Sequence, residues 1–113
     1  MELVAEERPG LLLVSIRAER IDAAAAIQFK DRMRELVQAH DGTPRIMLDM
    51  SHVAFLDSSG LGAVVAVMKL MGPDRQLELA GLTPTVEKVF RLTRMDSVFT
   101  VHPLVPDGLR NAG

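Results

Sequence analysis

The stretch FLDSSGLG, residues 55–62, marks the change from a strand-like to a helix-like sequence pattern. An apolar run precedes it, and apolar residues at helical spacing follow it as far as Gly72. A helix N-terminus presents unpaired backbone N–H groups and the positive end of the helix dipole, so it favours an anionic group. The stretch therefore predicts a helix start that Asp57 or one of the serines caps, and at which a serine can accept a phosphate.

The residues before this stretch predict strands on either side of a first helix. Residues 11–18 and 45–50 are apolar at most positions, which is typical of strands covered on both faces, and residues 3–6 predict a short edge strand. Between them, apolar residues recur at helical spacing from Ala23. We expect Asp22 to cap that helix and the Asp-Gly-Thr-Pro sequence at 41–44 to end it.

The residues after the stretch continue the alternation of helices and strands. A helix is expected over residues 58–71, ended by a Gly-Pro pair, and a strand over 76–80. Thr83 followed by Pro84 predicts another helix start, with the threonine as cap and the proline in the first turn. A short strand at 98–101 follows, and the tail from Pro103 predicts only a short, weakly specified terminal helix.

This order of elements predicts an α/β fold with a mostly parallel sheet and right-handed crossovers, in a single domain over residues 1–113. The small number of helices favours a sheet covered mainly on one face, although spacing alone does not decide this.

Composition argues against several classes of protein. The net charge of −2 gives no basic footprint for direct nucleic acid binding, and the absence of cysteine removes disulfides and thiolate sites. The three histidines lack acidic neighbours at ligand spacing, so neither a metal nor any other cofactor is expected. The acidic N-terminus does not resemble a signal peptide, and the longest apolar run is too short to span a membrane, so we expect a cytoplasmic protein.

The helix predicted at 58–71 is unusual because Lys69 is its one charged residue. One side of it forms a predicted core stripe, made of Leu61, Val64, Val65 and Met68. The opposite side carries small or apolar residues, namely Ser59, Ala63, Ala66 and Leu70, flanked by Gly62 and Val67. Two interpretations stay open, because this side is either covered by another element of the domain or is a docking face for a partner.

Enzymatic interpretations of the stretch are weak. A nucleophilic serine needs a positioned base, but His40 and His102 lie in predicted turns or tails, and His52 lies in a predicted connection. The first glycine of the G-x-S-x-G elbow is missing, and neither common phosphate-binding glycine motif is present. We therefore expect no catalytic residues.

The stretch resembles the hallmark of the STAS domain, in the branch of bacterial anti-sigma factor antagonists. Three further features are similar to that family: Asp22 before the first helix, the buried strand that ends in an aspartate, and the Leu-Thr-Pro step at 82–84. The resemblance covers nearly the whole chain. It implies a four- to five-stranded, mostly parallel sheet with helices mainly on one face.

The resemblance also implies a function. Members of this branch bind an anti-sigma factor, which is a serine kinase of the GHKL type, and so release a sigma factor. The kinase phosphorylates the first serine of the motif, here Ser58, and a phosphatase of the PP2C type reverses this. Together with the outward side of the 58–71 helix, the resemblance gives the predicted partner-binding residues: Asp22, Asp57, Ser59, Gly60, Leu61, Gly62, Ala63 and Ala66.

One departure from the family concerns the residues before the first helix. The family often has Gly-Glu-Leu-Asp there, whereas this chain has Ala-Glu-Arg-Ile-Asp at 18–22, with a basic Arg20 where an acid is common. The identity of the partner is therefore left open. Alternatives are a STAS subunit of another assembly, such as a stressosome or a lipid-transport complex, and a STAS domain that binds a small ligand.

Overall fold

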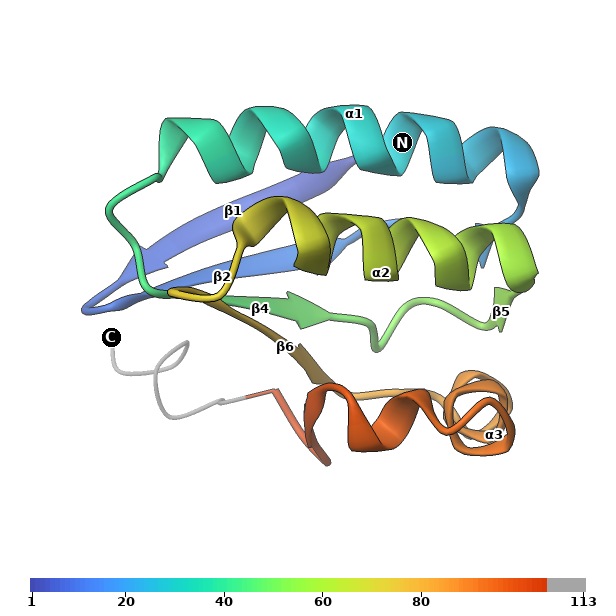
Figure 1. The fold of residues 1–113 in the computed structure, drawn as a ribbon. Coiled ribbons are helices and arrows are strands. Elements are labelled where there is room, and N and C mark those ends of the chain that lie inside the picture. Colours follow the sequence, from blue (N-terminus) through green and yellow to red (C-terminus); the bar gives the residue numbers. More distant parts are fainter. Residues whose placement is uncertain (106–113) are drawn as a thin grey trace.

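The strands of the chain form one five-stranded sheet and one two-stranded sheet in a computed structural model that describes residues 1–105 (Figure 1). The order in the larger sheet is β1 (Leu3–Arg8), β2 (Leu11–Ile16), β4 (Arg45–Asp49), β6 (Gln76–Ala80) and β7 (Thr100–His102). The first pair is antiparallel and the other three pairs are parallel. The smaller sheet pairs β3 (Arg20–Ile21) with β5 (Phe55–Leu56) in parallel.

Three α-helices connect the parallel strands: α1 (Ala23–Ala39), α2 (Ser58–Met71) and α3 (Pro84–Leu92). A short 3₁₀ turn, Met95–Ser97, precedes β7. The predicted α/β class, the mostly parallel sheet and the order of its elements are confirmed. The main differences are the unpredicted β3–β5 pair and the last strand, which begins two residues later than expected.

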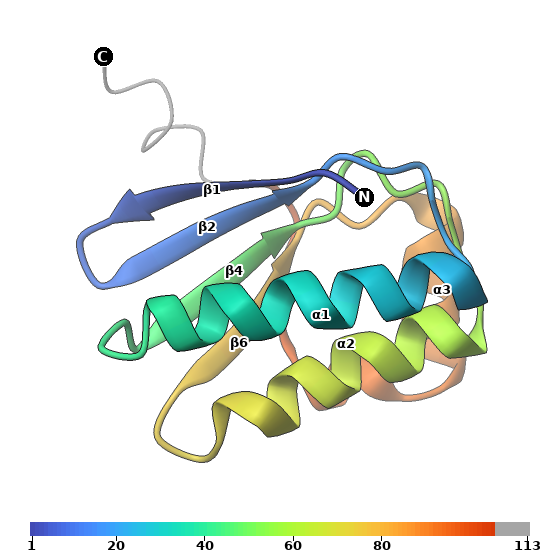
Figure 2. The same ribbon diagram turned by 90° about the horizontal axis from the view of Figure 1, so that it is seen from above.

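One hydrophobic core joins the three helices to one face of the sheet. Alternate strand residues such as Leu12, Ile46 and Leu79 pack there, because successive side chains of a strand point to opposite faces. Figure 2 shows α1 and α2 side by side across the sheet, and Figure 1 shows α3 near the end of β6. Phe29 of α1 and Phe90 of α3 are fully buried in the same cluster.

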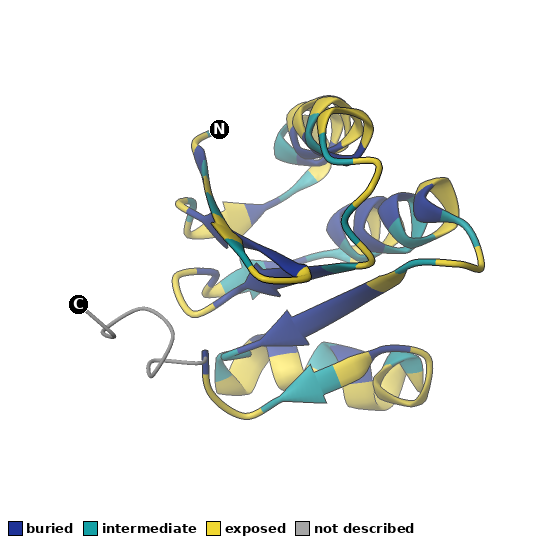
Figure 3. Cartoon of the chain, turned by 90° about the vertical axis from the view of Figure 1, so that its left-hand side faces the viewer, coloured by how far each residue is buried: buried dark blue, intermediate teal, exposed yellow. Residues whose placement is uncertain are grey.

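The second face of the sheet has its own smaller apolar cluster. Its members are Leu11, Leu13, Met47, Ala80 and Val105. All six residues of β2 are therefore buried, which confirms the prediction that this strand is covered on both faces (Figure 3). The predicted terminal helix after Pro103 falls mostly outside the described residues. Within residues 1–105, no helix is both long and apolar enough to span a membrane.

Glu78 places a buried carboxylate on this second face. Its side chain is 3% exposed and accepts hydrogen bonds from Arg45 Nε at 2.6 Å and Nη2 at 3.0 Å. Its Oε1 also lies 2.6 Å from Nε2 of His102 on β7. The hydrogen bond from Arg45 lowers the pKa of Glu78 below its usual 4.5, outweighing the opposite effect of burial.

Replacing Glu78 by glutamine is expected to lower the free energy of unfolding by about 1–2 kcal/mol at neutral pH, because two charge-assisted bonds weaken. The loss is moderate because the side chains of Arg45 and His102 are 43% and 37% exposed and can turn to water. A carboxylate with a lowered pKa stabilises the fold above its unfolded pKa and loses that contribution as pH falls. Urea unfolding should therefore show the difference at about pH 7 and a much smaller one at about pH 3. An equal difference at both would contradict this account.

Candidate functional site

The two-stranded sheet places the starts of α1 and α2 beside each other. Ile21 of β3 lies opposite Leu56 of β5 in a parallel register. Asp22 and Asp57 follow these residues directly, and each precedes the first residue of a helix. Since paired strands lie about 4.8 Å apart, the two helix starts are neighbours. The site is thus built by residues 20–22 and 55–60, which are far apart in the sequence.

Each helix is capped by its aspartate. A carboxylate oxygen of Asp22 accepts a hydrogen bond from the Ala25 amide at 3.0 Å, which confirms its predicted role. Asp57 Oδ1 accepts one from the Gly60 amide, also at 3.0 Å. The interpretation of Ser58 as the cap was therefore wrong. Ser58 is the first helical residue and is exposed, so its hydroxyl is left available for another role.

Gly60 is needed for close packing inside the domain. It is buried, and a Cβ atom added to it would lie 2.3 Å from the backbone oxygen of Ile21. No side chain fits at that distance, so the first turn of α2 rests directly on β3. The prediction that Gly60 contacts a partner is wrong for this reason.

The predicted faces of α2 also need correction. Its buried residues are Gly60, Ala63, Val64, Val67 and Met71. Ala63 is only 2% exposed, so it cannot contact a partner as predicted. The reason is that α1 packs along α2 and covers the side that carries Ala63 and Val67. For that side of α2, the interpretation of packing within the domain is therefore favoured.

The remaining predicted contacts stay on the surface to different degrees. Ser59 and Gly62 are exposed, together with Lys69 and Leu70 further along α2. Asp22, Asp57, Leu61 and Ala66 are partly buried. The exposed strip of α2 therefore begins at the serines and continues to the far end of the helix.

The loop before the motif is held by hydrogen bonds to distant segments. The Glu19 carbonyl accepts from the Ala54 amide at 2.7 Å and from the Phe55 amide at 3.0 Å. The Thr83 hydroxyl donates to the Val53 carbonyl at 2.7 Å. Thr83 occupies the predicted cap position of α3, with Pro84 following, but its side chain holds this loop rather than capping the helix. Hydrogen bonds to Glu19 and Thr83 thus hold the loop that leads into the motif.

The whole arrangement matches a known family. The family model of the STAS domain matches residues 2–108. This chain belongs to the STAS domain family. The STAS domain fold accounts for the observed topology, and the resemblance seen in the sequence is confirmed.

Similar proteins carry related names. An anti-sigma-B factor antagonist of Staphylococcus aureus is 29% identical over 63 residues, which is 55% of this chain and 58% of that protein. The solved structure of an anti-sigma factor antagonist from Mycobacterium paratuberculosis has a TM-score of 0.82 and 25% identity, covering 97% of this chain and 94% of that one. SpoIIAA of Bacillus, in its phosphorylated form, shares the fold with a TM-score of 0.68 and 17% identity, covering 99% and 100% of the chains.

The site of this STAS domain also contains Arg20, whose contact with Phe55 could not be predicted from the sequence. Its guanidinium lies 4.3 Å from the centroid of the Phe55 ring, a cation–π contact. Arg20 and Phe55 are directly opposite each other in the β3–β5 pair, and only that pairing brings them together. Arg20 and Phe55 each lie two residues before a capping aspartate, so this contact joins the two strands that lead into α1 and α2.

The histidines of the STAS domain are engaged elsewhere. His52, the nearest in sequence to Ser58, lies 3.5 Å from Arg17 and 3.4 Å from the Ser51 hydroxyl. His40 contacts Glu7, and His102 contacts Glu78. Among residues 1–105, no hydrogen bond joins a histidine to Ser58.

Proposed function

We propose that this STAS domain is an anti-sigma factor antagonist that binds an anti-sigma factor kinase of the GHKL type and thereby releases a sigma factor. Two findings support this assignment: a curated anti-sigma-B factor antagonist matches 55% of the chain, and a solved anti-sigma factor antagonist shares the fold over 97% of it. In this proposal Ser58 is the phosphoacceptor, and a phosphatase of the PP2C type restores the binding form.

The availability of Ser58 is the observation that carries the proposal. Asp57 has taken over the capping of α2, so the Ser58 hydroxyl is not needed to hold the helix start. A phosphate on Ser58 would lie at a helix N-terminus, where backbone N–H groups and the dipole tolerate negative charge. Modification there leaves the fold intact, as a reversible switch requires.

The charges around Ser58 explain how phosphorylation would end binding. Asp57 and Asp22 already place two carboxylates at the adjoining helix starts. A phosphate adds about −1.5 to −2 charges to the same small surface. A partner that packs against the unmodified serines and Gly62 would lose both its fit and its electrostatic match.

The test is to incubate the chain with each GHKL-type anti-sigma factor kinase of its source organism and Mg-ATP, and to locate the phosphate by mass spectrometry. We expect a single phosphate on Ser58, absent from Ser58→Ala and retained in the matched variant Ser59→Ala. Phosphate on Ser59 would show that Ser59, and not Ser58, is the phosphoacceptor, and would leave the rest of the mechanism unchanged. If a kinase binds the chain but transfers no phosphate, the switch is refuted.

A further inference from the structure

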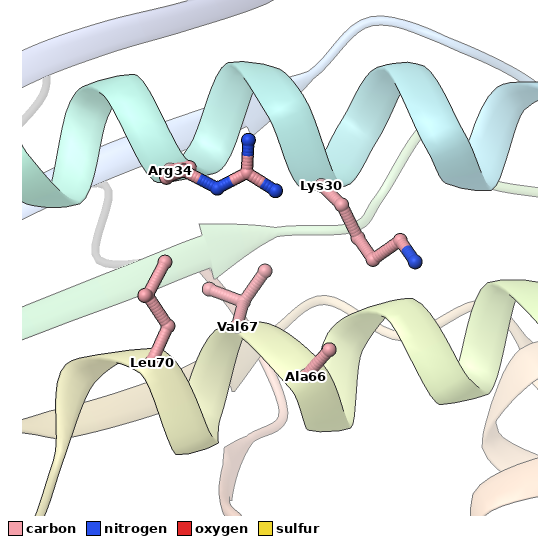
Figure 4. A pocket seen from close by; sticks show the side chains of 5 residues that line it. All are labelled: Lys30, Arg34, Ala66, Val67 and Leu70. Carbon is pink, nitrogen blue, oxygen red and sulfur yellow. The ribbon is translucent and has the colours of Figure 1, made fainter.

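Helices α1 and α2 leave a small groove between them on the outer surface of the domain. Lys30 and Arg34 line it from α1, and Ala66, Val67 and Leu70 line it from α2 (Figure 4). The groove contains a cavity of about 110 Å³. Figure 4 shows Ala66, Val67 and Leu70 pointing from α2 toward α1, Lys30 reaching into the space between the helices, and Arg34 lying along α1.

The size of the cavity favours a side chain over a small molecule. Pockets that bury small ligands usually measure roughly 300–1,000 Å³. A cavity of about 110 Å³ is much smaller and offers room for a single aliphatic side chain. Such anchor side chains, placed in a pocket of the partner, commonly carry most of the energy of a protein interface.

The charge of the groove selects an acidic partner. Lys30 and Arg34 are four residues apart, so they lie on one face of α1, whereas the α2 wall is apolar. Arg34 contacts Asp31 at 3.2 Å, but these side chains are 53% and 59% exposed and can exchange partners readily. The chain as a whole carries a net charge of −2, so these cations are not part of a general basic surface.

The groove is continuous with the proposed phosphorylation site. Along α2, exposed Ser58, Ser59 and Gly62 are followed by the partly buried Ala66 and then by exposed Leu70. A helix rises 1.5 Å per residue, so Leu70 lies about 18 Å along α2 from Ser58. A partner helix of about three turns could therefore reach both the serine and the cavity.

We propose that the α1–α2 groove receives an acidic amphipathic helix of the anti-sigma factor. One aliphatic side chain of that helix fills the cavity, and its carboxylates pair with Lys30 and Arg34. This inference rests on the proposed function, because it names the surface through which the same partner binds. The groove gives affinity at one end of the interface, and Ser58 controls the other end.

The experiment measures binding of each purified anti-sigma factor of the source organism to the full chain by biolayer interferometry. The test variant is Lys30→Glu with Arg34→Glu. The matched control is Lys88→Glu with Arg91→Glu, which makes the same charge change on exposed residues of α3. We expect binding at least about tenfold weaker for the groove variant and a change below about twofold for the control. Ala66→Leu, which fills the cavity without changing charge, should also weaken binding.

The outcomes separate the two proposals. Suppose that the wild type binds an anti-sigma factor, and that the Lys30→Glu, Arg34→Glu double variant and Ala66→Leu bind it as tightly as the wild type. The groove proposal is then overturned and the proposed function stands. Equal weakening of the groove variant and the α3 control would also overturn the groove proposal, since only overall charge would then matter. A wild type that binds none of the anti-sigma factors overturns both. Circular dichroism melts confirm that each variant is folded.

Discussion

Replacing Gly60 by alanine is expected to lower the free energy of unfolding by about 3 kcal/mol, at the upper end of the range for overpacked cores. The added methyl group would lie 2.3 Å from the Ile21 carbonyl oxygen, which belongs to the backbone and cannot rotate away. The first turn of α2 would have to separate from β3, and the Asp57 cap would be strained. Urea unfolding followed by circular dichroism measures the loss.

Gly62 provides a matched control in the same helix. Nothing lies within 4 Å of a Cβ atom added there, and the residue is exposed. Gly62→Ala should therefore stabilise the fold by about 0.5–1 kcal/mol, because alanine favours the helix. The same substitution by alanine is thus expected to lower the free energy of unfolding at Gly60 and to raise it at Gly62. A Gly60→Ala variant as stable as the wild type would show that β3 does not hold α2 in place.

Replacing Ser58 by aspartate is expected to weaken binding to the anti-sigma factor by about 100-fold, which corresponds to about 2.7 kcal/mol. The new carboxylate would stand next to the capping Asp57 on an exposed surface, close to Asp22. The fold should not change, because an acidic residue in the first turn of a helix interacts favourably with the dipole. Isothermal titration calorimetry with the purified anti-sigma factor gives the affinity.

Two controls separate the effect of charge at the site from other effects. Ser58→Ala removes the hydroxyl without adding charge, so it should bind but accept no phosphate. Thr85→Asp adds the same charge to the exposed first turn of α3 and should leave the affinity unchanged. Equal affinities for Ser58→Asp and Ser58→Ala would exclude an electrostatic switch at this position.

The order of the elements could be predicted because long periodic segments carry strong signals. The 17 residues of α1 show a clear amphipathic pattern with an aspartate cap, and the apolar strands stand out from the turns. The β3–β5 pair could not be found in this way. Each strand has two residues, which is too short for any alternation to show. The contact between Arg20 and Phe55 depends on that pair, so it could not be predicted either.

The sequence brought the candidate site residues to attention as a region, but it did not show their separate roles in the fold. A run of aspartate and two serines offers three possible caps, and only the geometry shows that Asp57 is chosen. Ala63 and Gly60 are small, and small residues suit both an exposed docking face and a tight internal contact. The sequence pattern alone does not say which neighbour comes close. Thr83 shows the same limit, since its hydroxyl bonds a loop 30 residues earlier.

The backbone contact between α2 and β3 determines what kind of signal a phosphate on Ser58 would give. With Gly60 seated against Ile21, the first turn cannot slide or tilt without losing that contact. The backbones of the two forms should therefore superimpose, and a partner would distinguish them by the charge and bulk of the phosphate itself rather than by a rearranged fold. Such a switch needs no rearrangement of the backbone, so it responds as soon as the phosphate is added or removed.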